Sequence, residues 1–96
     1  MIVRLSAPAD RDLKAITAYV AEDDPGAARN LLMRINERVA QLTRFPELGR
    51  RRLDIDINVR GLLIPPSLAI YRISLEEVVV LRVLHTSRDL NNTPLQ

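Results

Sequence analysis

The chain has 96 residues and a formal net charge of +2, so it can form one domain, residues 1–96, and is not a polycation that coats nucleic acid. The absence of cysteine excludes disulfides and suits a reducing cytoplasm, where we expect the protein. With only one histidine as well, a metal site is not expected. No apolar stretch reaches membrane-spanning length, and no signal peptide or nucleotide-binding loop is evident, so we expect neither a membrane partner nor a cofactor.

The first half of the chain predicts a short strand and two amphipathic helices. The strand is Ile2–Leu5, and Ser6 is a suitable N-cap for a helix that should end near Glu22. Asp24 is the N-cap of a second helix that should run over residues 25–43, so the acidic residues at this boundary are not interpreted as a metal site. Apolar residues recur at helical spacing and predict two buried stripes: Ala9, Leu13, Ile16 and Val20, then Ala28, Leu31, Leu32, Ile35, Val39 and Leu42.

A turn and an arginine run follow the second helix. Phe45–Gly49 should stop that helix, with Gly49 available for a positive φ. Arg50–Arg52 is interpreted as a solvated loop, since charged runs are more often surface than binding site. Asp54 and Asp56 alternate with apolar residues, so an edge strand or extended loop is expected near Ile55, with its carboxylates partly neutralising the arginines.

The second half predicts three further strands: Val59–Ile64, Leu68–Leu75 and Val78–His85. Pro65–Pro66 ends the first of them, because neither proline can donate to a ladder. The other two flank Glu76–Glu77 and predict a hairpin. If the two acids form the whole loop, Ile73 lies opposite Val80 and Tyr71 lies opposite Arg82, where its ring can stack on the guanidinium.

The last strand carries the most unusual residues. Arg82 stands in an otherwise apolar run, so its charge must meet water, a carboxylate or a ligand. His85, the only histidine, ends the strand and is followed by Arg88. Alternation predicts one face with Val79, Leu81, Val83 and His85, and the other with Val78, Val80, Arg82 and Leu84. Any chemistry or partner contact specific to this protein should lie near this edge.

The predicted order is β-α-α-β-β-β, an α+β fold. Because short turns join the later strands, we expect an antiparallel sheet with the helical hairpin packed on one face. Such a small sheet leaves an edge and an apolar face uncovered, so a partner segment could add a strand there and lay a helix against the hairpin.

Short motifs along nearly the whole chain resemble those of the ParE toxins, in the RelE/ParE superfamily of bacterial type II toxin–antitoxin modules. No single motif is specific, but their joint occurrence in the family's order is. The motifs are Ser6-Ala7-Pro8-Ala9 before Asp12-Leu13, Asp24-Pro25 with Ala27-Ala28, Phe45-Pro46-Glu47-Leu48-Gly49-Arg50, Arg60, Ile70-Tyr71-Arg72-Ile73, and Leu81-Arg82-Val83-Leu84-His85 with Arg88-Asp89.

The resemblance implies a toxin that arrests growth by poisoning DNA gyrase. It also implies a ParD-like antitoxin that neutralises the toxin in a hetero-oligomer and is the only part of the complex to contact operator DNA. The RelE branch implies a different activity, ribosome-dependent cleavage of mRNA. A third alternative is a non-toxic member that only binds its antitoxin.

The residues favour the gyrase branch, without enzymatic activity. RNA cleavage needs a proton acceptor, a proton donor and cations on the phosphate. Arg60, Arg82 and His85 could supply the cations and one proton carrier, but Thr86 stands where some relatives carry tyrosine, and the only lysine is Lys14. A structural role for His85, as a strand-end side chain that is hydrogen-bonded to the backbone, accounts for the residue at least as well as a catalytic role. The candidates for target or antitoxin contact are Arg60, Tyr71, Arg82, His85 and Arg88.

Overall fold

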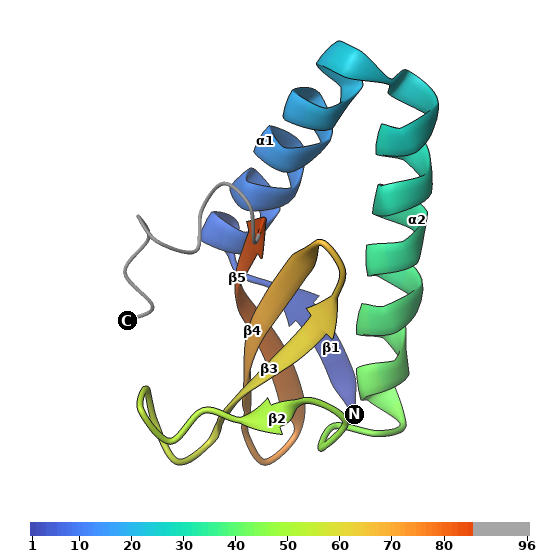
Figure 1. Ribbon diagram of the computed structural model, residues 1–96. Helices are drawn as coiled ribbons and strands as arrows, with labels where there is room; N and C mark the ends of the chain where they lie inside the picture. Colours follow the sequence, from blue (N-terminus) through green and yellow to red (C-terminus); the bar gives the residue numbers. More distant parts are fainter. Residues whose placement is uncertain (86–96) are drawn as a thin grey trace.

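The computed structural model describes residues 1–85 and shows two helices packed on a five-stranded sheet (Figure 1). Arg88, one of the predicted contact residues, lies outside the described residues. The elements are β1 (Ile2–Leu5), α1 (Ala7–Asp23), α2 (Pro25–Ala40), a 3₁₀ turn η1 (Gln41–Thr43), β2 (Arg50–Arg51), β3 (Val59–Ile64), β4 (Ser67–Ile73) and β5 (Glu77–His85). The predicted α+β fold is confirmed, and none of the helices within residues 1–85 is long and apolar enough to cross a membrane.

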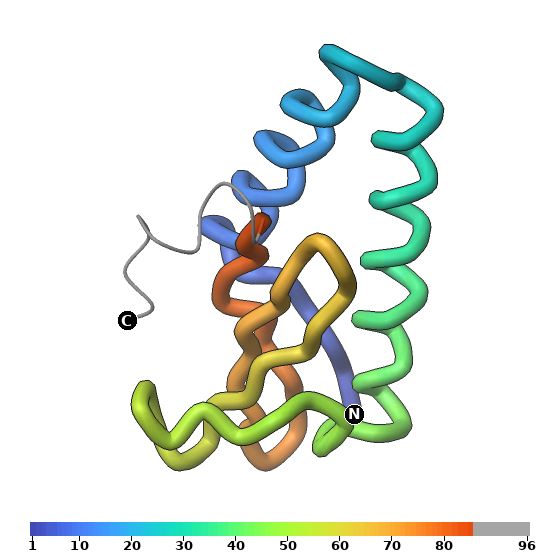
Figure 2. The backbone as a smooth tube through the Cα atoms, in the orientation of Figure 1, coloured from blue at the N-terminus to red at the C-terminus, as the bar shows by residue number. Residues whose placement is uncertain are grey.

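The sheet has the order β1-β5-β4-β3-β2 and is mixed rather than wholly antiparallel. β2, β3, β4 and β5 pair antiparallel with their neighbours, but β1 pairs parallel to β5, with Ile2 opposite Glu77 and Leu5 opposite Val80. The prediction for β1 was wrong because short turns constrain only the strands that they join, and no turn joins β1 to β5. The smooth trace in Figure 2 shows the N-terminus beside the end of α2, where the Met1 amino group donates to the Thr43 carbonyl at 3.1 Å.

Both helices begin at the predicted caps. The Ser6 Oγ accepts a hydrogen bond from the Ala9 N–H at 3.2 Å, and the Asp24 Oδ1 accepts one from the Ala27 N–H at 3.1 Å. The second helix keeps α geometry to Ala40 and continues as the 3₁₀ turn to Thr43.

The core lies between the helical hairpin and one face of the sheet. Both predicted stripes point into it: Ala9, Leu13, Ile16, Leu31, Ile35, Val39 and Leu42 are buried, Ala28 is buried beside them, and Val20 and Leu32 are half-buried. The sheet contributes Leu62, Ile64, Ala69, Tyr71, Val78, Val80 and Val83. Burying apolar surface of this kind supplies most of the stability of a small domain.

A β-bulge in β5 changes which side chains reach the core. Tyr71 lies opposite Val80 and Ile70 lies opposite Arg82, so Leu81 is an extra residue between the two pairs. The predicted alternation therefore fails after Val80, and Val83 joins Val78 and Val80 in the core. Ser6 bonds to two backbone carbonyls at the bulge: its N–H donates to the Val80 carbonyl and its Oγ donates to the Leu81 carbonyl, both at 2.9 Å.

The β4–β5 hairpin also differs from the prediction. Its loop is Ser74–Glu76 rather than two glutamates, and the Ser74 N–H donates to the Glu77 carbonyl at 2.9 Å. Ile73 consequently lies opposite Val78, not Val80. A small strand does lie beside β3, but at Arg50–Arg51, and residues around Ile55 form turns instead.

Candidate functional site

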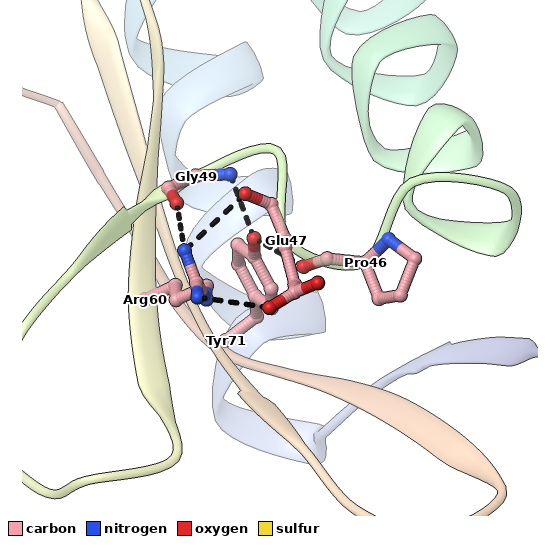
Figure 3. Close-up of polar contacts among 5 residues, drawn as sticks. All are labelled: Pro46, Glu47, Gly49, Arg60 and Tyr71. Carbon is pink, nitrogen blue, oxygen red and sulfur yellow. Dashed lines mark hydrogen bonds and ion pairs between the residues drawn. The ribbon is translucent and has the colours of Figure 1, made fainter.

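Two of the predicted contact residues, Arg60 and Tyr71, lie in one polar cluster (Figure 3). The Tyr71 side chain is fully buried, and its hydroxyl donates to the Pro46 carbonyl at 2.7 Å and accepts from the Gly49 N–H at 2.8 Å. The Arg60 Nη1 donates to the carbonyls of Gly49 at 2.8 Å and Glu47 at 3.2 Å, and its Nη2 lies 3.4 Å from the Glu47 carboxylate. Both side chains therefore fasten the segment between η1 and β2 onto the sheet.

Gly49 is required here for its lack of a side chain, not for a positive φ. It does not adopt a positive φ, so that prediction was wrong. A Cβ on Gly49 would stand 2.8 Å from the Gly61 carbonyl oxygen and 2.8 Å from Cε1 of Tyr71, closer than real Cβ contacts allow. The tyrosine ring and the turn thus come together only because residue 49 is glycine.

Burial is the main reason why the pKa of the Tyr71 hydroxyl is raised above its usual value of about 10, against a smaller opposing effect of the Gly49 N–H and of Arg60. The neutral phenol is therefore the form that the folded protein favours. With its raised pKa, the Tyr71 hydroxyl is a weaker acid than that of a free tyrosine.

We expect Tyr71→Phe to lower the free energy of unfolding at pH 7 by about 1–3 kcal/mol, because it leaves the buried Gly49 N–H without an acceptor. A group whose pKa is raised on folding contributes stability below its unfolded pKa and loses that contribution as the pH rises through the folded value. The wild type should therefore lose more stability than the variant above about pH 10.

Urea unfolding at pH 7 and at alkaline pH measures both effects of this substitution. Tyr19→Phe is a suitable control, since Tyr19 lies on α1 and is 48% exposed, whereas Tyr71 is fully buried. Equal alkaline slopes for the wild type and Tyr71→Phe would contradict the assignment.

Arg82 is held by a carboxylate from α1. Its Nε lies 2.7 Å from Asp12 Oδ2 and its Nη2 lies 3.0 Å from Oδ1, and the same Oδ2 accepts from the Val83 N–H at 2.9 Å. The expectation that this charge needs a partner is met. The predicted stacking on Tyr71 is wrong, because the longer β4–β5 loop pairs Tyr71 with Val80 and the bulge then places Arg82 opposite Ile70. Asp12 was missed as a partner because 70 residues separate it from Arg82.

His85 lies at the end of β5 and packs against Tyr19 of α1. Its side chain is 7% exposed, and its ring packs edge to face against Tyr19, with centroids 6.0 Å apart and an interplanar angle of 72°. The structure therefore does not gather the four described candidates into one site: Arg60 and Tyr71 fasten a turn, whereas Arg82 and His85 each contact α1.

The arginine run divides into two environments. Arg52 forms a bidentate pair with Asp54, at 3.0 and 2.8 Å, which lowers the pKa of that carboxyl. Arg50 and Arg51 are exposed on β2, and within residues 1–85 neither side chain forms a hydrogen bond or ion pair. The expected neutralisation by aspartate thus applies to Arg52 alone.

A shallow groove of about 370 Å³ runs along the helical hairpin. Small and apolar side chains from both helices, Ala18, Ala21, Ala28 and Leu32, form its surface, and the cationic Lys14 and Arg29 lie at its rims. Residues of this size let another helix approach closely.

The fold agrees with the comparisons to known proteins. The family model described as the ParE toxin of the type II toxin–antitoxin system, parDE, matches residues 3–90. The chain belongs to the ParE toxin family. A ParE relative, Toxin ParE3 of Caulobacter vibrioides, is 35% identical over 78 residues, covering 80% of this chain and 78% of the relative.

A solved structure supports the same assignment. The chain is similar to one from the chromosomal ParDE toxin–antitoxin system of P. aeruginosa, with a TM-score of 0.74 and 28% identity, covering 88% of this chain and 95% of the other. The resemblance inferred from the motifs is therefore confirmed, and the chain is a ParE-type toxin of a type II toxin–antitoxin system.

Proposed function

We propose that this ParE-family toxin arrests growth by inhibiting DNA gyrase rather than by cleaving mRNA. The geometry of the candidate residues supports this. A general acid or base must reach the proton that it transfers, yet Tyr71 is fully buried with both hydrogen-bonding positions of its hydroxyl used, and His85 is buried against Tyr19. The two arginines that could bind a phosphate are engaged by backbone carbonyls and by Asp12.

The proposal includes a ParD-like antitoxin that neutralises the toxin. The groove on the helical hairpin suits an amphipathic helix, because it is lined by small apolar side chains and flanked by Lys14 and Arg29. An antitoxin segment that folds there would carry its apolar face inward and its carboxylates at the rims. In this arrangement operator DNA is contacted by the antitoxin and not by this chain.

Induced expression in a bacterium tests the proposal. Gyrase inhibition predicts DNA double-strand breaks and an SOS response, loss of supercoiling by purified gyrase, and recovery of growth when the ParD-like antitoxin is expressed as well. Cuts in ribosome-bound mRNA without DNA damage would instead establish the endonuclease alternative. Normal growth with intact antitoxin binding would establish the non-toxic alternative.

We expect His85→Ala to keep its toxicity within a few-fold of the wild type, because gyrase inhibition requires no proton transfer by this ring. The edge-to-face contact with Tyr19 would be lost, at a cost of about 0.5–1.5 kcal/mol in the free energy of unfolding. Growth curves and urea unfolding measure the two effects separately. Complete loss of toxicity in a variant that is still folded at the growth temperature, with mRNA cuts in the wild type, would reverse the ranking of the two activities.

A further inference from the structure

A hollow of about 400 Å³ lies beside the cluster of Figure 3, between β2, the β2–β3 loop and the N-terminus. Arg51 and Arg60 contribute cations to it, Glu47 contributes a carboxylate, and Met1, Ile57 and Ile73 contribute apolar surface. It combines cationic and apolar walls within one recess.

The β2–β3 loop that carries Ile57 is braced from inside the chain. Arg52 bonds to Asp54, and its carbonyl accepts from the N–H groups of Ile55 and Asp56 at 3.0 and 3.1 Å. At the far end of the loop, the Asn58 carbonyl accepts from the Ile73 N–H at 3.0 Å. These contacts hold Ile57 on the surface, 75% exposed, where it adds nothing to the core. A surface that is already ordered costs little conformational entropy when a partner binds.

The charges of the hollow favour a protein carboxylate. Arg51 is exposed and forms no ion pair or side-chain hydrogen bond within residues 1–85, so its guanidinium is available to a partner. The Arg60 side chain is only 15% exposed and lies against the Glu47 carboxylate, which is largely exposed. A nucleic acid backbone suits this hollow poorly, because its phosphates would leave the apolar walls uncovered, whereas a peptide can place an apolar side chain against them beside its carboxylate.

We propose that this hollow binds an acidic segment of the toxin's target protein, with a carboxylate on Arg51 and an apolar side chain against Ile57 and Met1. The inference rests on the proposed inhibition of gyrase. A toxin meets its target when it is free of antitoxin, so the surface that binds the target must be formed in the free chain. The hydrogen bonds within the β2–β3 loop meet this requirement, because they order the loop without a partner. β2 and the N-terminus, which border the hollow, lie at the opposite end of the molecule from the α1–α2 turn (Figure 1). The hairpin groove is lined by residues on both sides of that turn.

The test uses Arg51→Glu, Ile57→Asp and the double variant. Both positions are exposed, so the variants should fold. Arg50→Glu is the matched control, since Arg50 is the adjacent residue of β2, has the same charge and lines a different hollow with Leu48 and Leu63. Four quantities are measured for each: inhibition of purified gyrase, growth arrest, affinity for the antitoxin, and the urea midpoint.

We expect the double variant to inhibit gyrase about tenfold or more weakly than the wild type, and Arg50→Glu to stay within about twofold. Antitoxin affinity and urea midpoints should change little in all of them. The single variants should each show part of the loss, which keeps the test valid if the double variant is less stable.

Several outcomes would overturn the inference. Unchanged inhibition by the double variant, or an equal loss in Arg50→Glu, removes the role of this hollow. Weaker antitoxin binding with unchanged gyrase inhibition assigns the hollow to the antitoxin instead. If the wild type does not inhibit gyrase, the proposed function fails on its own, and growth arrest by the same variants then decides whether the hollow contacts the target.

Discussion

Gly49→Ala should lower the free energy of unfolding by about 3 kcal/mol, at the upper end of the cost of overpacking a buried site. The new Cβ would stand 2.8 Å from the Gly61 carbonyl and from the Tyr71 ring, and neither is the free end of a flexible side chain. Relief requires either β2 to separate from β3 or the tyrosine hydroxyl to leave the turn. Both movements also displace Arg51, so toxicity should fall together with stability.

Gly61→Ala is the control for this substitution. Gly61 is buried in β3, opposite Arg50, but there a Cβ would meet Cδ1 of Leu68 at 3.4 Å and Cγ of Arg52 at 3.6 Å, which are ordinary contacts. We expect the free energy of unfolding of Gly61→Ala to change by about 1 kcal/mol or less, because alanine fits the strand and has less conformational freedom than glycine in the unfolded chain. Urea unfolding of both variants gives the comparison, and equal midpoints would show that the turn at Gly49 yields more easily than its contacts indicate.

Asp12→Ala should be the second strongly destabilising substitution, at about 2–3 kcal/mol. It leaves the Arg82 guanidinium and the Val83 N–H without the carboxylate that both use. The Arg82 side chain is 32% exposed, so water moderates the loss relative to a fully buried pair. Asp12→Asn keeps an acceptor for the Val83 N–H and should therefore cost less than Asp12→Ala.

Asp10→Ala is the matched control for this prediction, because Asp10 pairs with Lys14 on the same helix at 3.0 Å with both side chains exposed. Its effect should be about 0.5 kcal/mol or less. Thermal and urea unfolding at low and high salt separate the two pairs, since only the exposed one should respond strongly to ionic strength. Similar costs for the two alanine variants would mean that Arg82 finds another partner.

Local chemistry was sufficient to predict the helices and most strands. The caps at Ser6 and Asp24 and the helical spacing of the apolar stripes depend only on residues a few positions apart, and the structure confirms them. The strand β3 was also predicted with its observed ends, because Pro65 follows it directly.

Contacts between distant residues were not predictable in the same way. Apolar residues stand on both sides of the Leu81-Arg82 pair, in Val78–Val80 and in Val83 and Leu84, so the hydropathy pattern does not mark the bulge. The carbonyls at the bulge are held by Ser6, whose sequence signal as an N-cap does not reveal a second partner 75 residues away. The register error for Tyr71 begins at the hairpin loop, which pairs Ile73 with Val78 and therefore Tyr71 with Val80, and the bulge then places Arg82 opposite Ile70.

The parallel pairing of β1 with β5 has a consequence for how the toxin is made. β5 lies between β1 and β4, so the sheet cannot be assembled from β1 until β5 has left the ribosome. Joining the two strands closes almost the whole described chain into one loop, which makes the pairing late and slow relative to the helical hairpin. A nascent or truncated chain that lacks β5 therefore has no strand to join β1 to β4, and synthesis itself delays completion of the sheet.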